Sequence, residues 1–499
     1  MSRSDCALSA DKHELAVHVR AGAGLILIDT HDEPRAAELL RHVAREVARP
    51  VFLWSAARGL KRLGSQSGLD GTFDQPAELL RHIDQRQDGA IFLLADFHPF
   101  LNDPVIARLA REISRDHDRP GATLVLVGHN IALPDSLKPR AVRFDLTTPS
   151  RAELEAMIHE QAVEWTDGRG HAQARVDPDM IERLVLNLNG LAMKDARRLV
   201  RNAIHDDGVL DETDLPELMK TRFDLLDASG ALSFELDTER FTAVAGMPRM
   251  KKWLERRKPV FVAADPPKGL DAPKGLLLLG VQGCGKSLAA RAVAGFFGVP
   301  LLHLDAGALF NRFHGESERN LRRALEGADR MEPCVLWIDE IEKGMATGDN
   351  DGGTSKRMLA TLLTWMAERD TRVFMVATAN DITALPPELV RKGRFDEVFF
   401  VDLPDHATRR EVFAIHLARR DIKPMLYDLD ALAEAADGFS GAELEHAVVS
   451  GLYSAHAEAR ELTNRDILEA IQDTRPLSVM MAEPIQQLRD WARERAVPA

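Results

Sequence analysis

The chain contains little cysteine, little tyrosine and no long apolar run. It has 499 residues, of which three are cysteine and two are tyrosine. Cys6, Cys284 and Cys334 show no Cys-x-x-Cys spacing, which argues against a disulfide framework or a zinc site and favours a reducing compartment. No apolar run approaches the roughly 18–20 residues that span a bilayer. The N-terminal stretch also lacks the apolar segment of a secretory signal, so we expect no membrane span and a cytoplasmic location.

An excess of basic residues is also missing. Lys and Arg number 64 against 78 Asp and Glu, and the net charge is −14. A broad nucleic-acid footprint needs a basic face, so a nucleic-acid partner is not expected. The one local basic run, Lys251–Lys258, lacks the alternating aromatic residues of a single-strand binder and is interpreted as a solvated helix face.

Short apolar runs alternate with helical patterns in both halves of the chain. This order, with strands apolar on both faces, predicts parallel α/β sheets. The expected strands are Leu25–Ile28, Val51–Trp54, Ala90–Ala95 and Thr123–Val127 in the first half, and Gly275–Leu279, Leu301–Leu304, Cys334–Ile338, Val373–Ala377 and Val398–Val401 in the second. The repeated order favours an internal duplication, while two unrelated α/β domains remain the alternative.

Five segments follow from this pattern, within the two to four domains that a chain of this length allows. Residues 1–149 are expected to form an α/β domain and residues 150–205 its helical lid. Residues 206–240 are acidic and are expected to be an irregular linker. A second α/β domain is expected over 241–404, followed by a helical lid and C-terminal helices over 405–499.

A glycine-rich loop stands between the strand 276–279 and a helix that begins near Leu288. It reads Gly280-Val-Gln282-Gly283-Cys284-Gly285-Lys286-Ser287. In this strand–loop–helix context the loop predicts a phosphate cradle made by backbone N–H groups and a helix N-terminus. Lys286 is expected to reach the β- and γ-phosphates, and the Ser287 hydroxyl to bind Mg²⁺. Cys284 is interpreted as a small filler of the loop rather than a redox switch.

Two acids end the apolar run Cys334–Ile338. On a buried parallel strand they emerge at the carboxyl edge of the sheet, where open α/β sheets bind ligands. Asp339 is expected to hold Mg²⁺ and Glu340 to activate the attacking water. A strand end that simply meets solvent is the alternative, which the position after the glycine loop disfavours.

With these motifs, residues from about 241 to 453 resemble an AAA ATPase module. Val376-Ala-Thr-Ala-Asn380 is similar to the family's first sensor strand, which implies that Asn380 positions the water. The segment Leu385–Asp396 resembles the second region of homology, which implies that Arg391 and Arg394 act as arginine fingers on the nucleotide of a neighbouring subunit. A guanidinium supplied in this way neutralises charge developing on the γ-phosphate.

The resemblance also covers the nucleotide base. It implies that Ala243 and Ala245 flank adenine, that His416 lies near the ribose, and that Gly441 and Ala442 bring the lid backbone over the nucleotide. Gln282 and Leu288 complete the binding set on the glycine loop and the helix that follows it. The cofactors implied are ATP and Mg²⁺.

The segment Leu309–Glu318 resembles the first pore loop of AAA rings. Phe313 matches the aromatic residue that grips extended polypeptide, and Gly315 matches the glycine, whereas His314 departs from the usual apolar partner. The alternative for Phe313 is a core side chain.

Over its whole length the chain resembles the AAA proteins first known as hypothetical chloroplast open reading frames, which adds a stroma-like plastid compartment to the possible locations. The first half has no Gly-Lys-Ser after its first strand, and Phe97 stands where a catalytic glutamate would be. We expect it to be a degenerate AAA-like domain that acts as scaffold or docking site, so that an unidentified protein substrate or adaptor binds through residues 1–205.

These features predict an ATP-hydrolysing motor that assembles into a homo-oligomeric ring, expected to be a hexamer, and threads, remodels or disassembles a protein or complex. The alternative is a nucleotide-gated binding module that docks a partner through the first half without threading.

Phe313 distinguishes the two. A Phe313→Ala chain is expected to keep basal ATP hydrolysis and to lose substrate remodelling, because the grip and the hydrolytic site use different residues. Parallel assays of both activities test this, and survival of both would contradict threading.

Overall fold

The computed structural model divides the chain into two compact units, which are described separately. One comprises Met1–Ile181 with Leu188–Asp211, and the other Glu182–Asn187 with Glu212–Ala499. The residues that the structure describes are 4–30, 32–63, 73, 75–86, 88–115, 121–129, 131–168, 175–226, 232–235, 241–263, 266–305, 316–345, 354–391 and 393–499.

The first unit contains a six-stranded sheet with the order β3-β2-β4-β5-β1-β6. Its pairs are parallel except for β2 with β3. The strands are β1 (Leu25–Asp29), β2 (Val51–Ser55), β3 (Gly59–Arg62), β4 (Ile91–Ala95), β5 (Thr123–Gly128) and β6 (Ala141–Arg143). All four strands expected in this half are confirmed, because each is a buried apolar run.

Helices cover both faces of this sheet. They are α1 (Ser4–Arg20), α2 (Glu33–Val47), α3 (Pro76–Gln85) and α4 (Pro104–Ile113), with short 3₁₀ turns at His98–Asn102 and Lys138–Arg140. Along β1 alternate residues enter two cores: Ile26 packs with residues of α1 and α2, and Leu27 with residues of α3 and α4. Helix α2 begins where Asp32 accepts a hydrogen bond from the Arg35 backbone, with Pro34 in its first turn.

Three helices follow: α5 (Arg151–Gly168), α6 (Pro178–Leu188) and α7 (Met193–Asp207), with a two-stranded pairing of β7 (Arg175–Val176) and β8 (Val209–Leu210). Helix α6 is divided between the two units, since Glu182–Asn187 belong to the second. On α7 the buried residues Ala196, Val200 and Ile204 form the apolar face that a helical lid requires.

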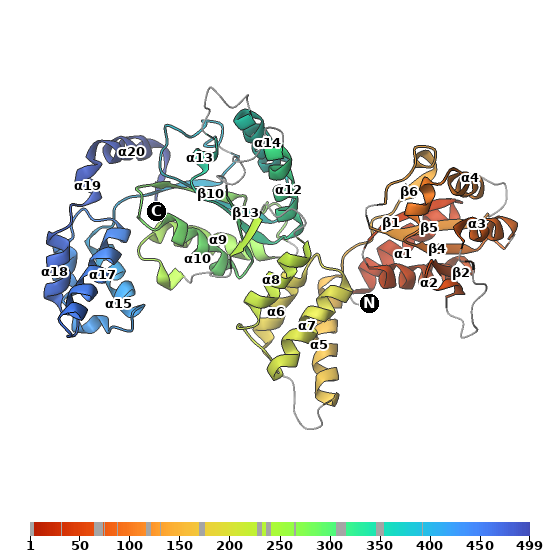
Figure 1. Cartoon of the computed structure of the whole chain (residues 1–499), viewed down its shortest axis with the longest axis horizontal. Coiled ribbons are helices and arrows are strands. Elements are labelled where there is room, and N and C mark those ends of the chain that lie inside the picture. Colours follow the sequence, from red (N-terminus) through yellow and green to blue (C-terminus); the bar gives the residue numbers. More distant parts are fainter. Residues whose placement is uncertain are drawn as a thin grey trace. The chain divides into compact units, whose positions relative to one another are not determined.

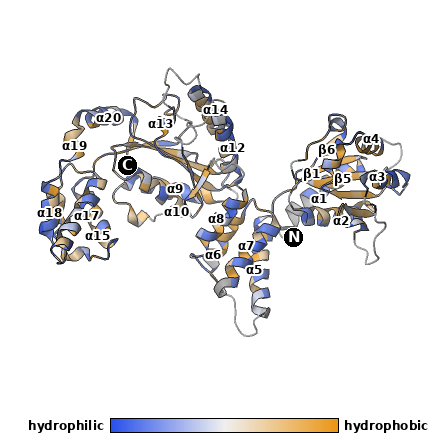
Figure 2. Ribbon diagram, viewed as in Figure 1, coloured by the Kyte–Doolittle hydropathy of each residue, from blue (hydrophilic) through white to orange (hydrophobic). Residues whose placement is uncertain are grey.

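The second unit contains a seven-stranded sheet with the order β15-β14-β10-β13-β12-β11-β9. Its strands are β9 (Leu232–Glu235), β10 (Gly275–Gly280), β11 (Leu301–Leu304), β12 (Cys334–Ile338), β13 (Val373–Ala379), β14 (Glu397–Val401) and β15 (Val497–Pro498). The helices around it are α9 (Pro248–Val262), α10 (Lys286–Phe297), α12 (Glu316–Arg330), α13 (Ile341–Met345) and α14 (Thr354–Glu368), drawn in Figure 1. The five expected strands are confirmed. Figure 2 shows the hydrophobic colouring of the strands in both sheets.

The two sheets share one order of parallel strands. Numbered within each half by their sequence, the first five parallel strands run fifth, first, fourth, third, second in both sheets, and an antiparallel strand flanks the second. The second sheet adds a sixth parallel strand, β15, beside its fifth. In the first half the flanking strand is β3, which follows β2 in the sequence. In the second half it is β9, which precedes β10. The shared order supports the duplication.

Residues 206–240 differ from the irregular acidic linker that was expected. They contain the end of α7, strand β8, helix α8 (Leu215–Leu226) and strand β9. Arg222 of α8 is fully buried and its Nη2 donates to the Glu332 carbonyl at 2.8 Å. Phe223 and Leu232 join the core of the seven-stranded sheet. The acidic composition concealed the apolar anchors of α8, since Leu215, Leu218 and Met219 are buried at the spacing of a helix that packs on one face.

The C-terminal part begins with a helical lid that has its own core. Its helices are α15 (His406–Ala418), α16 (Leu429–Ala435), α17 (Gly441–Ala457) and α18 (Asn464–Gln472). Two more helices follow, α19 (Leu477–Met480) and α20 (Ala482–Arg495). Among the helices that the structure describes, none is long and apolar enough to cross a membrane.

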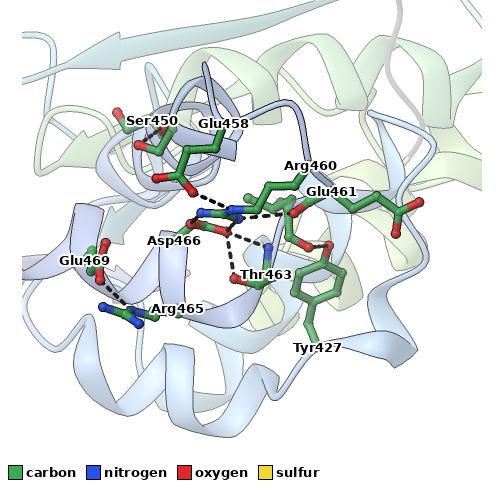
Figure 3. Close-up of polar contacts among 11 residues, drawn as sticks. Tyr427, Ser450, Glu458, Arg460, Glu461, Thr463, Arg465, Asp466 and Glu469 are labelled. Atoms are coloured by element: carbon green, nitrogen blue, oxygen red, sulfur yellow. Dashed lines mark hydrogen bonds and ion pairs between the residues drawn. The ribbon is translucent and has the colours of Figure 1, made fainter. Parts of the chain in front are cut away.

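A charged clamp closes the turn between α17 and α18 (Figure 3). Asp466 is buried, and its Oδ2 accepts hydrogen bonds from Arg460 Nη1 at 2.6 Å and from the Thr463 backbone at 2.8 Å. The Arg460 guanidinium, bonded to both carboxylate oxygens, holds the pKa of Asp466 well below its usual range. One side chain therefore caps α18 and anchors the preceding loop.

Replacing Asp466 by alanine is expected to destabilise the lid by about 1–3 kcal/mol, since Arg460 and Thr463 lose a common buried acceptor. Because the folded pKa lies below the unfolded value near 3.9, the stabilisation is complete above about pH 5 and is lost as the pH falls through the folded pKa. Urea unfolding at pH 7 and at pH 3.5 measures both effects.

The control is Glu469→Ala on the same helix, which breaks only the exposed Arg465–Glu469 pair at 2.7 Å. Its expected cost is within about 0.5 kcal/mol. Equal destabilisation by the two variants would contradict the clamp.

Candidate functional site

The glycine loop joins the end of β10 to the start of α10. A Cβ on Gly280 would lie 2.0 Å from the Val401 carbonyl oxygen of β14, so only glycine fits there. Gly283 has a φ of 76° and lies against the lid, where a Cβ would come within 3.2 Å of Ala442 Cβ. Gly280 is thus required by a close backbone approach, and Gly283 is favoured by its positive φ and by the side chains of the lid that lie against it.

Lys286 lies inside this loop. Its side chain is buried, and its Nζ donates to the carbonyl oxygens of Gly280 and Val281, each at 2.8 Å. Burial lowers the pKa of Lys286 to about 8. The loop therefore holds a desolvated ammonium at the N-terminus of α10, an arrangement suited to a phosphate group.

Three neighbouring elements meet at Asp339, directly after β12. The Ser287 hydroxyl of α10 donates to Asp339 Oδ1 at 3.1 Å, and the Thr378 hydroxyl of β13 donates to the same oxygen. Thr378 Oγ1 in turn accepts the Glu340 backbone N–H at 2.9 Å. A hydroxyl and a carboxylate oxygen side by side form a donor set that suits Mg²⁺.

Glu340 and Asn380 face one another across the ends of β12 and β13. Asn380 Nδ2 donates to Glu340 Oε1 at 2.9 Å. Behind them, buried Glu342 accepts the Asn380 backbone N–H at 2.9 Å, and burial raises the pKa of Glu342. Lys343 pairs with the other oxygen of Glu340.

The sequence-based prediction missed three members of this network: Thr378, Glu342 and Lys343. Thr378 gave a usable signal, because a hydroxyl near the end of a buried strand and two residues before Asn380 lies on the same edge of the sheet. Gln282 lines the same 230 Å³ cavity as Lys286, Asp339 and Asn380.

A larger cavity of about 520 Å³ adjoins the loop. The predicted residues that line this cavity are Ala243, Ala245, Gly283, Cys284, Gly285, Leu288, His416, Gly441 and Ala442. The Ala442 backbone N–H of the lid donates to the Gly283 carbonyl at 2.9 Å, which joins lid and loop. The volume is within the range of pockets that take drug-sized ligands.

His416 projects into this cavity as a half-buried ring. Its Nδ1 lies 3.5 Å from Glu445 Oε1, and burial lowers the pKa of the imidazole. The ring is therefore neutral at pH 7, and it presents an uncharged edge to a ligand.

The two predicted arginine fingers lie elsewhere. Arg391 is exposed, and Arg394 Nη1 donates to the Leu363 carbonyl at 2.6 Å. Among the described residues, neither arginine lines the cavities around Lys286. Phe313, His314 and Gly315 lie outside the described residues.

Burial determines the direction in which the pKa values of the two cysteine thiols of the second unit are shifted. It raises the pKa of Cys284 to about 11 and that of Cys334 to about 12. Reactive cysteines need thiolate character and access, so the structure supports the interpretation of Cys284 as a filler of the loop.

In a Cys6→Ser background, iodoacetamide at pH 7.5 is therefore expected to leave both thiols largely unmodified in the folded protein and to modify both in urea. Mass spectrometry of tryptic peptides provides the measurement. Rapid alkylation of Cys284 in the folded chain would show an exposed, reactive loop instead.

Comparison with protein families matches three segments of the chain. The AAA family, described as the ATPase family associated with various cellular activities, matches residues 276–403. The SpoVK-like AAA ATPase N-terminal domain matches residues 11–146, and the SpoVK-like second domain matches residues 152–229. The first of these segments contains the glycine loop and the acids described above.

Individual relatives cover either the whole chain or its ATPase half. Uncharacterized AAA domain-containing proteins named ycf46 are 33% identical in Trieres chinensis, over 96% of each chain, and 33% identical in Guillardia theta, over 95% of this chain and 93% of the relative. A proteasome-activating nucleotidase of Saccharolobus solfataricus is 36% identical over 210 residues, which are 41% of this chain and 53% of that protein. Full-length similarity at this level shows that the chain belongs to the family of AAA domain-containing ATPases that includes the ycf46 proteins.

Proposed function

We propose that the second unit hydrolyses ATP and uses the energy to remodel, thread or disassemble a protein or protein complex. The observation that carries the proposal is the hydrogen-bonded set Ser287, Asp339, Thr378, Glu340 and Asn380 beside the buried ammonium of Lys286. The proposal assigns these residues, at one edge of one sheet, the roles of a phosphate-binding loop, a cation-binding pair and a base with its positioning amide.

Each residue has a role that follows from its position. Lys286 and the loop N–H groups bind the phosphates, and Ser287 with Asp339 would hold Mg²⁺, which supplies charge neutralisation between the β- and γ-oxygens when bound. Glu340 accepts a proton from the water that attacks the γ-phosphorus as the β–γ bond breaks. Asn380 orients that water and the carboxylate. The adenine occupies the 520 Å³ cavity, flanked by Ala243, Ala245 and His416.

The proposed ring depends on Arg391 and Arg394, the two proposed arginine fingers. Exposure of Arg391 and its separation from this chain's own site suit a residue that acts on a neighbouring copy. Arginine fingers contribute ~10³–10⁵ in rate in related nucleotide enzymes, so a monomer is expected to be nearly inactive. We propose a hexameric homo-oligomer.

Remodelling draws support from similarity to a protein named a proteasome-activating nucleotidase. In the first unit, β1 leads into Asp29 and Thr30, with no Gly-Lys-Ser loop. We therefore propose that residues 1–205 dock a substrate or adaptor and do not bind ATP. A cytoplasmic or stroma-like location stays a prediction.

The test is ATPase activity resolved by particle size. Wild-type protein is passed over a column with light scattering, with and without ATP, and compared with Glu340→Gln. We expect an ATP-dependent ring that the variant traps, with turnover reduced by at least about 10²-fold, since a general base contributes roughly that factor.

Glu368→Gln, an exposed glutamate at the end of α14, is the matched control and is expected to turn over normally. Hydrolysis by a monomer at a rate independent of concentration would refute the trans arginine mechanism. An ATP-dependent change in partner binding without a ring would favour the nucleotide-gated binding module.

A further inference from the structure

The last residues of the chain add a strand to the ATPase sheet. In β15, Val497 pairs with Phe399 and Pro498 with Phe400, parallel to β14. The Ala499 N–H continues the pairing by donating to the Phe400 carbonyl at 3.0 Å. Val497 and Ala499 pack against the same buried cluster as Val401. The strand is thus fixed by backbone and apolar contacts together.

This strand lies at the larger cavity. Pro498 and Ala499 line it, along with Asp402 and Leu403, which follow β14. The other walls come from the segment 243–248, the glycine loop and the lid helices α15 and α17. The smaller cavity, which contains Lys286, Ser287 and Asp339, has no lining residue from the segment 477–499. Residues 497–499, here called the tail, therefore lie at the end of the proposed site that is away from the phosphate groups.

Two anchors hold the tail in place. Arg489 of α20 forms hydrogen bonds to both oxygens of Asp402, with Nε at 3.0 and 2.9 Å. Further back, the Leu477 backbone N–H of α19 donates to Glu443 at 2.8 Å, and Glu443 closes the capping box of α17. Buried Ile485 and Leu488 attach α20 to the two cores of the sheet. As Figure 1 shows, α19 and α20 lead from the lid helices back to the sheet.

We propose that residues 497–499 are a positioning element of the nucleotide site, which forms a wall of the base pocket and contacts the nucleoside part of a nucleoside phosphate. The proposal rests on the proposed ATP site and deepens it. The phosphate groups are assigned to the smaller cavity around Lys286, which no residue of 497–499 lines. The tail therefore contributes to the affinity for a nucleoside phosphate and not to the affinity for inorganic polyphosphate.

The experiment compares Mg²⁺-ADP with inorganic tripolyphosphate on the full chain and on a chain that lacks residues 497–499. Titration calorimetry is expected to show ADP binding weakened about tenfold, the loss that follows from exposing roughly two methylene-sized apolar groups. Tripolyphosphate binding is expected to be unchanged. Arg493→Ala, an exposed change on α20 that leaves the tail intact, is the control and is expected to bind both ligands as wild type does.

A second measurement needs no variant. Hydrogen exchange of the Ala499 amide in the wild-type chain is expected to slow when ADP is added and to stay the same with tripolyphosphate, because only ADP fills the pocket that the tail lines. Unchanged ADP affinity in the shortened chain would overturn the proposal, and so would an equal loss of affinity for ADP and tripolyphosphate. An exchange rate of the Ala499 amide that does not change when ADP is added would also overturn it. Failure of the wild-type chain to bind ADP at all would refute the ATP site itself, so the two proposals fail in different ways.

Discussion

One carboxylate, Asp339, connects the elements that form the candidate site. It accepts hydroxyl hydrogen bonds from Ser287 of α10 on one side and from Thr378 of β13 on the other, and the register of β12 with β13 brings Thr378 within reach. That register depends in turn on continuous apolar strands buried on both faces, since a slip by one residue would turn Thr378 away from the site. Packing in the sheet therefore sets the geometry of the chemistry, although none of the packed residues contacts a ligand.

The two halves share one strand order but carry different residues at the carboxyl edge of the sheet. Both sheets place the ends of their first, third and fourth strands next to each other. In the second half that edge carries a lysine, a hydroxyl and two acids. In the first half it carries Asp29 and Asp96, with His129 3.8 Å from Asp29 and no glycine loop between strand and helix. Without a glycine loop and its lysine to offset them, these carboxylates repel phosphate, which is consistent with the proposed loss of nucleotide binding there.

How much the sequence could predict depended on how local each signal was. The parallel strands are continuous apolar runs, and the glycine loop is a contiguous motif, so both were predicted correctly with their residues. Helix α8 was missed because acidic letters around it suggested a linker, while its anchor Arg222 is an unusual residue to find fully buried. Strand β15 was beyond prediction, since two residues carry no periodicity and their pairing with β14 spans about 100 residues of chain. The positions of Thr378 and Glu342 similarly depend on strand ends that meet only in three dimensions.

The bond between the lid and the glycine loop is made by backbone atoms alone, from the Ala442 N–H to the Gly283 carbonyl. A side-chain change at either position leaves the donor and the acceptor present, and only proline at 442 would remove the donor itself. This hydrogen bond between lid and loop is therefore insensitive to most substitutions of surface side chains. Helices α15 to α18 can accumulate changes on their outer faces, for new partners or new compartments, while the lid keeps the same connection to the loop beneath it.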